Sequence, residues 1–365
     1  MPDMITVIIP TACRGDLLRK CLQSLAQQTL QGFGIILVAD GSGDWAVDLS
    51  KEYRCNLLRL PQSRGFAAAV NAGAALADSE YILLLNDDVE LNRDWLRITA
   101  AVLDERRDAA FCCGKLYRPD GLLDNAGDAV SLAGSAWRLG HGRCDGGQFE
   151  VMRPVLGMPG TAALVRKNVW RELGGFDEDF VSYLEDVDFS LRAARRGYCG
   201  LYQPQARAVH HGGATSGGPE SAGVFRLLTA NQLIIAAKHL PVRFWLRVLW
   251  AQLLWAGMAV KKRLLGAWVS GIVRFLRLAR REWQKGRLLQ REGKQRFVAL
   301  LKDSDAEIYA DVCAPDRQVQ DTFWRLYFAL FPPRYNREHI KNLEDEGWRM
   351  DICTGGRDTK EHIRQ

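Results

Sequence analysis

Residues 81–90 read YILLLNDDVE, and this stretch decides both the fold and the chemistry that we expect. Five apolar residues are followed directly by Asn86, Asp87 and Asp88. A short, unbroken apolar run is typical of a strand that is buried on both faces of a parallel sheet. Ligands bind at the carboxyl ends of such strands, where carboxylates can hold Mg²⁺ or Mn²⁺ against substrate phosphates. On this stretch alone, an Asx turn that merely ends the strand is an equally good interpretation.

Strand-like and helix-like segments alternate over the first ninety residues. Apolar runs predict strands at residues 5–10, 34–40 and 57–60, and apolar residues at helical spacing predict helices at residues 16–28 and 66–77. This alternation predicts βαβ units and a mostly parallel, doubly wound α/β sheet. The turn after the first strand has no G-x-G-x-x-G, and the chain has no G-x-x-x-x-G-K-[ST], which argues against a dinucleotide-binding Rossmann domain and a P-loop.

The composition is that of a globular protein with reduced cysteines. With 365 residues, 47% of them hydrophobic, the chain is long enough for about two domains. No signal-peptide pattern precedes the first strand, so we expect a cytoplasmic location. The nine cysteines show no CxxC spacing. The adjacent pair Cys112 and Cys113 suits neither a zinc site nor a disulfide, so free thiols are expected.

Three further positions carry polar groups that suggest chemistry. Asp40 ends the second strand, where it can bind a nucleotide or simply stabilise its own turn. Residues 184–197 predict a helix with three carboxylates in its first turn, and a carboxylate at a helix N-terminus stays ionised, as a general base must. His210 and His211 precede two glycines, and either a structural role or a metal or phosphate role fits them.

These motifs, in this order, resemble the family 2 inverting glycosyltransferases of the GT-A fold. The closest likeness is to the rhamnosyltransferase-like branch that builds bacterial surface polysaccharides, lipopolysaccharide among them. The resemblance covers about residues 4–240. The stretches that carry it are Val7–Thr11, Asp40–Asp44, Arg64–Gly73, Leu83–Asp88, Gly174–Glu178, Glu185–Asp188 and His210–Gly213.

The resemblance implies a role for each candidate site residue. Asp88 and His210 would bind a divalent metal, Mg²⁺ or Mn²⁺, with His211 as the less favoured histidine. Asp186 would be the general base that deprotonates the acceptor hydroxyl for attack with inversion, and Glu185 would orient the acceptor. The nucleotide would be bound by Pro10, Thr11, Asp40, Arg64, Asn71 and Asp87.

A strongly basic segment follows the resembling region. Residues 238–302 contain sixteen Lys and Arg against two acidic residues, so this segment carries +14 and the remainder of the chain about −8. Five of the eleven tryptophans also lie here, and the apolar stretch 246–260 is too short to span a bilayer. Basic amphipathic helices with tryptophan are typical of an anionic membrane interface. A helical hairpin with a solvated basic face is the alternative.

Together these features predict an α/β GT-A catalytic domain at residues 1–240, with a nucleotide half at about 1–90 and an acceptor half at about 91–240. Basic amphipathic helices at the membrane interface would follow at 241–302, and a small helical appendage at 303–365. The predicted enzyme is a peripheral protein of the inner face of the cell membrane. It would transfer a hexose such as rhamnose from a nucleotide-diphosphate sugar to a polyprenyl-diphosphate-linked or polysaccharide acceptor.

Three other function classes fit the sequence less well than a glycosyltransferase does. A non-catalytic sugar-nucleotide-binding protein or membrane scaffold on the same fold is the main alternative. A nucleotidyltransferase would require a glycine-rich, basic loop after the first strand, and residues 10–15 contain a single glycine. No nucleic-acid-binding motif accompanies the basic segment, so no nucleic-acid partner is expected.

Overall fold

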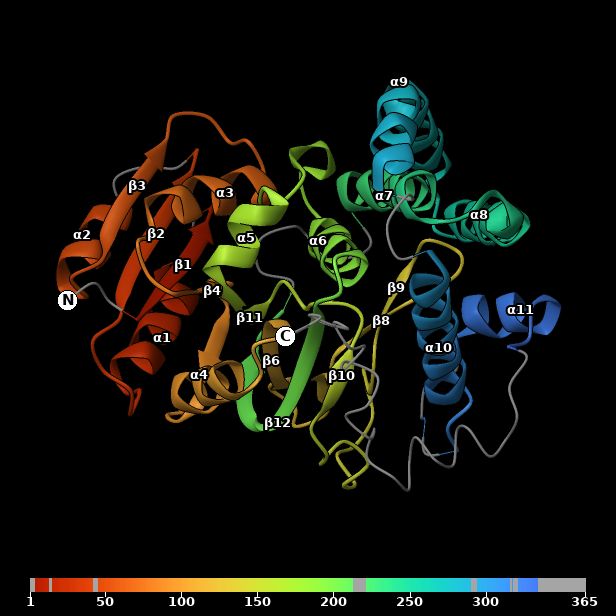
Figure 1. The fold of residues 1–365 in the computed structure, drawn as a ribbon. Helices are drawn as coiled ribbons and strands as arrows, with labels where there is room; N and C mark the ends of the chain where they lie inside the picture. The colour runs from red at the N-terminus through yellow and green to blue at the C-terminus, as the bar shows by residue number, and fades with distance from the viewer. Residues whose placement is uncertain are drawn as a thin grey trace, which may run out of the picture.

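The computed structural model describes residues 4–12, 15–41, 45–212, 221–289, 294–315, 317 and 321–333. Residues 42–44 and 213, which belong to two of the predicted motifs, lie outside these ranges, as does most of the predicted appendage, from residue 334 onward. Within the described part, a helix-flanked sheet adjoins a group of C-terminal helices (Figure 1).

A mixed sheet forms the centre of the molecule, with strand order β10-β12-β6-β11-β4-β1-β2-β3. The strands β1 to β4 run parallel to one another, β6 and β12 are also parallel, and β11 lies antiparallel between β4 and β6. The α/β class with a mostly parallel sheet is therefore confirmed. The strands of this path are β1 (Ile5–Thr11), β2 (Gly34–Asp40), β3 (Asn56–Leu60), β4 (Tyr81–Leu85), β6 (Ala109–Tyr117), β10 (Arg153–Val155), β11 (Ala162–Arg166) and β12 (Cys199–His210).

Four short strands lie beside this path. β5 pairs with β12, β7 pairs with β6, and β8 and β9 form a separate two-stranded sheet. These strands are β5 (Val89–Leu91), β7 (Leu123–Asn125), β8 (Asp128–Val130) and β9 (Ala136–Arg138). The pairing of β5 with β12 places His210 opposite Val89, directly after the acidic motif.

Helices cover both faces of the sheet, which explains why β4 is apolar at every position and fully buried. One core lies between the sheet and α1 (Gly15–Ala26) and α4 (Trp95–Glu105). A second lies between the sheet and α3 (Phe66–Leu76), α5 (Lys167–Leu173) and α6 (Glu185–Arg195). The short helix α2 (Trp45–Glu52) packs beside β2 and β3.

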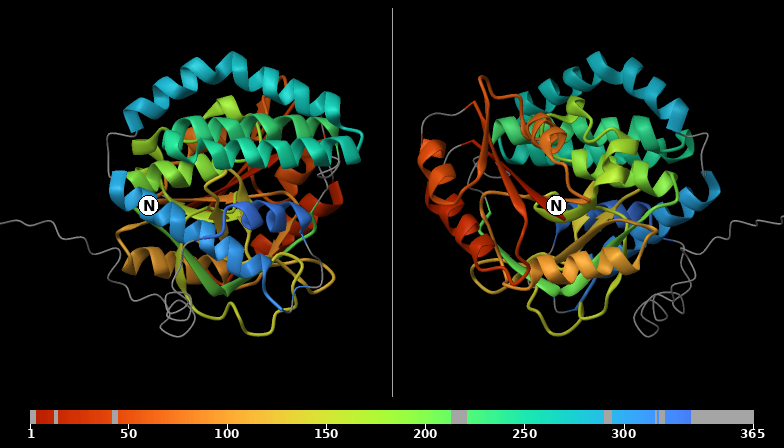
Figure 2. Two further views of the ribbon diagram at one scale, coloured as in Figure 1. Left: turned by 90° about the vertical axis from the view of Figure 1, so that its right-hand side faces the viewer. Right: turned by 60° about the vertical axis from the view of Figure 1, so that its left-hand side comes forward.

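The C-terminal helices pack on the sheet-bearing part of the chain through α6. A third core joins Val187 and Leu191 of α6 to Ile234, Phe275 and Phe297 of the helices that follow. Figure 2 shows α9 lying along α7 at the edge of the molecule. The helices are α7 (Ala222–His239), α8 (Trp245–Lys261), α9 (Leu265–Leu289), α10 (Lys294–Val312) and α11 (Thr322–Leu330). Since α10 runs across residue 302, the predicted domain limits stay predictions.

None of the helices in the described ranges has the length and hydrophobicity that a bilayer crossing requires.

Candidate active site

The carboxyl ends of β1 and β4 bring two predicted site residues into contact. The two strands pair in parallel, and the Thr11 hydroxyl donates a 2.6 Å hydrogen bond to Oδ2 of Asp87. Pro10 is the residue before Thr11 in the same strand. Asp87 is therefore hydrogen-bonded at the strand ends, and Asp88 is the carboxylate of the motif that lies near His210.

Asp88 faces His210. Nε2 of His210 lies 3.5 Å from Oδ1 of Asp88, and this oxygen is buried without a hydrogen bond to any described residue. On the other side of the ring, Nδ1 of His210 donates a 2.8 Å hydrogen bond to Oδ2 of Asp124, at the middle of β7. Burial opposes a charge on this imidazole, but the carboxylates of Asp124 and Asp88 stabilise the protonated ring and raise the pKa of His210 to about 9.

The Asp88–His210 pair fits a divalent metal. A metal-ligating histidine usually donates its other ring N–H to a carboxylate, which fixes the ring and its tautomer, and Asp124 is in that position. The unbonded oxygen of Asp88 supplies a hard ligand of the kind that Mg²⁺ and Mn²⁺ prefer. His211 points elsewhere, since its Nε2 lies 2.6 Å from Glu90. The geometry therefore favours His210 over His211 as a ligand.

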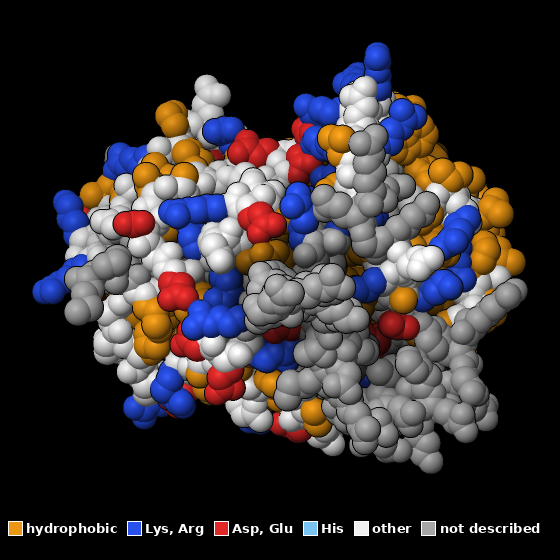
Figure 3. All heavy atoms as spheres, in the orientation of Figure 1, with side chains coloured by type: hydrophobic (Ala, Val, Ile, Leu, Met, Phe, Trp, Pro, Cys, Tyr) orange, Lys and Arg blue, Asp and Glu red, His pale blue; other side chains and the backbone are white. Residues whose placement is uncertain are grey.

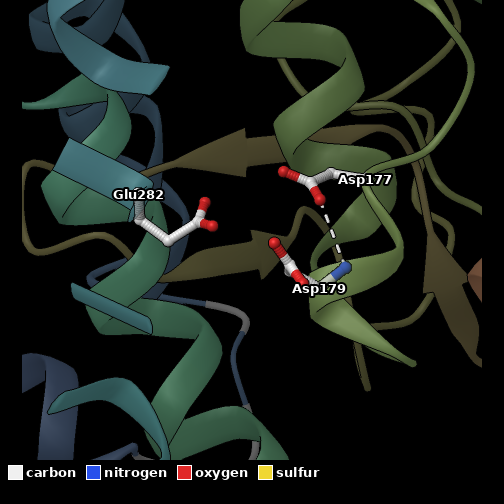
Figure 4. A group of neighbouring side chains, drawn as sticks. All are labelled: Asp177, Asp179 and Glu282. Atoms are coloured by element: carbon white, nitrogen blue, oxygen red, sulfur yellow. Dashed lines mark hydrogen bonds between the residues drawn. The ribbon is translucent and has the colours of Figure 1, made fainter. Parts of the chain in front are cut away.

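A second acidic group, Asp177, Asp179 and Glu282, does not need a metal (Figure 4). The ammonium of Lys285 lies 2.6 Å from Asp177, 2.7 Å from Asp179 and 2.9 Å from Glu282. Lys238 adds a further contact of 2.7 Å to Asp177. Because these ammonium groups already neutralise the carboxylates, we interpret the group as an ion-pair network that ties the loop before α6 to α7 and α9.

Asp186 sits in the first turn of α6, against the segment that leads into β11. The backbone N–H of Gly160 donates a 2.7 Å hydrogen bond to Oδ2 of Asp186. A Cβ at residue 160 would lie 2.7 Å from that oxygen, so only glycine permits the approach. Next along the chain, Thr161 accepts a 2.9 Å hydrogen bond from the backbone N–H of Asn86. This register places Asp186 beside the Asn86–Asp88 motif.

Asp186 is one of three neighbouring carboxylates. Burial raises the pKa of Asp186 to about 6, although the N–H groups of Gly160 and Val187 pull it in the opposite direction. Burial and the charge of Asp186 raise the pKa of Glu185 well above its usual value. The same two causes raise the pKa of Asp128 to about 7. Crowding of this kind keeps protons on some of the carboxylates and is typical of acid–base sites.

Glu185 and Asp188 differ from Asp186 in their surroundings. Glu185 is buried, and its Oε2 has no hydrogen-bond partner among the described residues. Asp188 contacts Lys238 at 2.6 Å, His239 at 2.8 Å and Arg192 at 2.8 Å, and it has the lowered pKa of a fully paired carboxylate. Of the three acids in this turn, Asp188 therefore anchors the helix.

The loop before α6 has an unusual backbone. Val181, Tyr183 and Leu184 all have positive φ angles, of 65°, 72° and 68°. Such conformations cost free energy in residues with a side chain, and they persist only where surrounding contacts enforce them. The amide of Asn231, buried in α7, supplies these contacts by donating hydrogen bonds of 2.7–3.0 Å to three carbonyls of residues 180–183.

The remaining nucleotide candidates form a second group at the end of β2. Both carboxylate oxygens of Asp40 are bonded by the 63–65 turn, including a 2.8 Å bond from the backbone N–H of Arg64. The side chains of Arg64 and Asn71 both bond to Glu178 in the loop before α6, at 2.8 Å and 3.2 Å. Their contact with a nucleotide stays a prediction.

Sequence reasoning missed Asp124, Asp128 and Asn231. Asp124 and Asp128 lie on strands of three residues each, which are too short for a periodic pattern. Asn231 lies inside a helix with no motif around it. One clue was available, since residues 124–128 read DNAGD, a polar, glycine-bearing stretch within an apolar region.

The chain is similar to known proteins over the region that contains this site. Residues 6–174 match the model of Glycosyl transferase family 2. The N-acetylglucosaminyl-diphospho-decaprenol L-rhamnosyltransferase of Mycobacterium tuberculosis is 26% identical over 281 residues, which covers 68% of this chain and 90% of that protein. The O-antigen biosynthesis protein RfbC of Myxococcus xanthus is 31% identical over 223 residues. That match covers 58% of this chain.

Two of these relatives are much longer than the matched region. The chain covers 17% of RfbC and 26% of an uncharacterized protein of Sinorhizobium fredii, which is 29% identical over 244 residues and matches 61% of this chain. Among solved structures, the crystal structure of GalNAc-T7 with UDP, GalNAc and Mn²⁺ has a TM-score of 0.56 at 14% identity. The match covers 82% of this chain and 58% of the GalNAc-T7 chain, and the likeness shows the shared fold.

Proposed function

Residues 6–174 form a family 2 glycosyltransferase domain, and from this premise we propose that the chain is a metal-dependent, inverting glycosyltransferase of surface-polysaccharide synthesis. Its donor would be a nucleotide-diphosphate sugar such as a rhamnosyl donor, and its acceptor a hydroxyl on a polyprenyl-diphosphate-linked or polysaccharide chain. The observation that carries the proposal is the link between Asp186 and the acidic motif: Gly160 donates to Asp186, and its neighbour Thr161 accepts from Asn86.

On the donor side, Asp88 and His210 would hold Mg²⁺ or Mn²⁺, which neutralises the charge that develops on the leaving diphosphate. Asp124 orients the His210 ring so that Nε2 faces Asp88. The nucleotide would lie along the ends of β1 and β2, where Thr11 and Asp40 are located. The contacts among Asp124, His210 and Asp88 support the assignment of the donor site to this edge of the sheet.

On the acceptor side, Asp186 would accept the proton of the attacking hydroxyl. A base with a pKa near 6 is largely ionised at neutral pH and is still basic enough to take a proton in the transition state. Hydrogen bonds from Gly160 and Val187 hold the carboxylate in one orientation. The backbone of residues 181–184, which Asn231 holds in place, sets the start of α6 and therefore the position of Asp186.

The C-terminal helices would bind the membrane face. Apolar side chains at Leu246, Leu249 and Leu253 form an exposed stripe on α8, and Leu265, Val269, Val273 and Leu276 form one on α9. Thirteen of the sixteen large exposed hydrophobic residues of the described chain lie in residues 242–330. Figure 3 shows hydrophobic side chains gathered over the α8 side of the molecule with Lys and Arg beside them. This mixture suits a peripheral protein on an anionic bilayer.

The tryptophans contribute less to this surface than the aliphatic residues. Trp255 stacks on Phe225 with ring centroids 4.4 Å apart and donates to Thr229, and Trp250 donates to the carbonyl of Leu326. Most of these rings therefore hold the helices together. The membrane proposal depends instead on the leucine and valine stripes and on the basic residues that border them.

The stereochemical outcome tests the proposed reaction. The protein is incubated with a nucleotide sugar and membrane extract as the acceptor source, and the anomeric configuration of the new linkage is determined by NMR. Inversion relative to the donor is expected for one base and a single displacement. Retention of configuration would contradict the assignment of Asp186 as the base for direct attack.

A further inference from the structure

A basic groove lies between the first turns of α7 and the middle of α9. It is open to solvent and has a volume of about 440 Å³. Its lining combines three guanidinium groups with apolar side chains, namely Arg226, Arg274, Arg277, Val269, Val273 and Leu278. No motif of the sequence and no part of the donor site described above accounts for it.

A close helix crossing brings the arginines together. Gly271 of α9 packs against α7 so tightly that a Cβ there would lie 2.6 Å from Thr229 and 2.7 Å from the carbonyl oxygen of Arg226. Arg274 and Arg277 follow Gly271 on the next turns of α9, so their charges face Arg226 across the crossing. Burial and the nearby charge of Arg226 lower the pKa of Arg274.

Within the described part of the chain, two of the three arginines of the groove lack the ion pairs that other cations of α9 have. Among the described residues, neither Arg226 nor Arg277 is within ion-pair distance of a carboxylate, and Nε of Arg274 is buried without a hydrogen bond. By contrast, Arg281 and Lys285, farther along the same helix, are paired with Asp179. Clustered guanidinium groups favour a multiply charged anion, because their planar N–H groups match phosphate oxygens.

We propose that this groove binds the diphosphate head group of a prenyl-diphosphate-linked acceptor. The inference rests on the proposed function and gives its acceptor a binding site. Val269 and Val273 line the groove and also belong to the exposed apolar stripe of α9, so a phosphate group and a hydrocarbon chain can be bound side by side. A site that binds only an inorganic anion does not require apolar side chains beside its arginines.

The groove is connected to the candidate base. Arg274 donates a hydrogen bond to the backbone carbonyl of Asp179, in the 3₁₀ turn Glu178–Phe180. The chain then passes through residues 181–184, with their positive φ angles, into Glu185 and Asp186 at the start of α6. A head group on the arginines is thus bound next to the loop that positions the base.

The experiment measures binding of farnesyl diphosphate, a short prenyl diphosphate, to the full chain by calorimetry. The double variant Arg226→Gln plus Arg277→Gln is compared with Arg280→Gln plus Arg243→Gln, which removes the same charge from exposed arginines outside the groove. Hydrogen bonds to charged groups are each worth roughly tenfold in affinity. We therefore expect the groove variant to lose at least about tenfold and the control variant less than about threefold. Equal melting temperatures verify that both variants fold.

Three outcomes would overturn the inference. The groove variant could bind farnesyl diphosphate like the wild type, or the two variants could lose affinity equally, which would indicate general surface attraction. Alternatively, inorganic pyrophosphate could bind as tightly as farnesyl diphosphate, which would exclude a lipid ligand. Donor cleavage, followed separately as release of nucleoside diphosphate, reports on the proposed function. A failure of the acceptor-site inference can therefore be distinguished from a failure of the proposed function.

Discussion

Oδ2 of Asp124 lies 2.8 Å from Nδ1 of His210, and this bond turns the opposite ring nitrogen toward Asp88. The two residues are 86 positions apart in the sequence, on β7 and β12, and the pleated sheet brings them together through β6. Asp124 also accepts a 2.7 Å hydrogen bond from Arg138 and is 3% exposed, so its carboxylate is fixed from two sides. The candidate metal ligand is thereby held in one orientation.

The variant Asp124→Ala should therefore weaken metal binding. Loss of the carboxylate that orients a metal-ligating histidine typically costs about 10- to 100-fold in metal affinity. We expect a decrease of that size in Mn²⁺ affinity, measured by the EPR signal of free Mn²⁺ in a titration. Asp88→Asn and His210→Ala should lose binding altogether.

Arg138→Met provides the matched control, since it removes another partner of Asp124 and leaves His210 in place. Its Mn²⁺ affinity should stay within about threefold of the wild type. If Arg138→Met weakens Mn²⁺ binding as much as Asp124→Ala does, the effect comes from general disturbance of β7 and β9, and the orienting role is wrong.

Asp186→Asn should abolish sugar transfer and leave nucleotide binding nearly unchanged. General-base catalysis contributes about 10²- to 10⁴-fold, and the amide has no basic lone pair to replace it. Transfer rates and calorimetric binding of the nucleoside diphosphate check the two parts separately. Near-normal turnover by the variant would exclude Asp186 as the base.

The pH dependence follows from the raised pKa of Asp186. Its ionised form is the active base, so kcat/KM should rise with pH through about 6 and level off above it. Below that pH the carboxyl carries a proton and transfer declines about tenfold per pH unit. A profile that stays flat between pH 5 and 8 would show that no group with this pKa controls the reaction.

Asn231→Ala should affect both stability and turnover. The side chain donates to three carbonyls of the loop before α6. The Phe180 carbonyl keeps a bond from the Ser182 N–H, and a buried group that is left unpaired costs about 1–3 kcal/mol. A lower melting temperature and a lower kcat are expected, with the KM for the donor little changed. Gln252→Ala removes a buried amide that bonds Gln232, and it should lower stability without the same loss of kcat.

Membrane binding should depend on the exposed apolar stripes. The double variant Leu249→Ser plus Leu253→Ser removes side chains that are 55% and 65% exposed on α8. Since burying a leucine contributes about 1.5–3 kcal/mol, flotation with phosphatidylglycerol vesicles should decrease by about tenfold or more. Leu76→Ser, at a side chain 60% exposed on α3, should leave flotation unchanged. An equal decrease in both would rule out a specific membrane face.

Much of the fold follows from local patterns, and the exceptions have a physical reason. The apolar run of β4 and the alternation of strands and helices up to residue 90 predict the parallel half of the sheet, which the structure confirms. No strands were predicted in residues 91–157. Four of the strands there are only three residues long and mix polar with apolar side chains, and the nine-residue β6, AAFCCGKLY, was also missed. Their positions depend on pairing with distant strands.

The candidate site divides in a similar way. Carboxylates that end a buried strand or begin a helix, such as Asp88 and Asp186, can be recognised from their neighbours in the sequence. Asp124 and Asn231 act on partners 86 and about 50 residues away, and no local pattern reveals such contacts. Gly160 is an intermediate case. A glycine permits a close approach of another group, and the structure identifies that group as Asp186.

The most direct test of the central claim is a donor screen. The purified protein is incubated with a panel of nucleotide-diphosphate sugars, with Mg²⁺ or Mn²⁺ and then with EDTA, and release of nucleoside diphosphate is followed. The account predicts metal-dependent release from one donor, lost on addition of EDTA and in Asp88→Asn. Release that persists with EDTA and in Asp88→Asn, or no release from any donor with membrane extract as acceptor source, would contradict it.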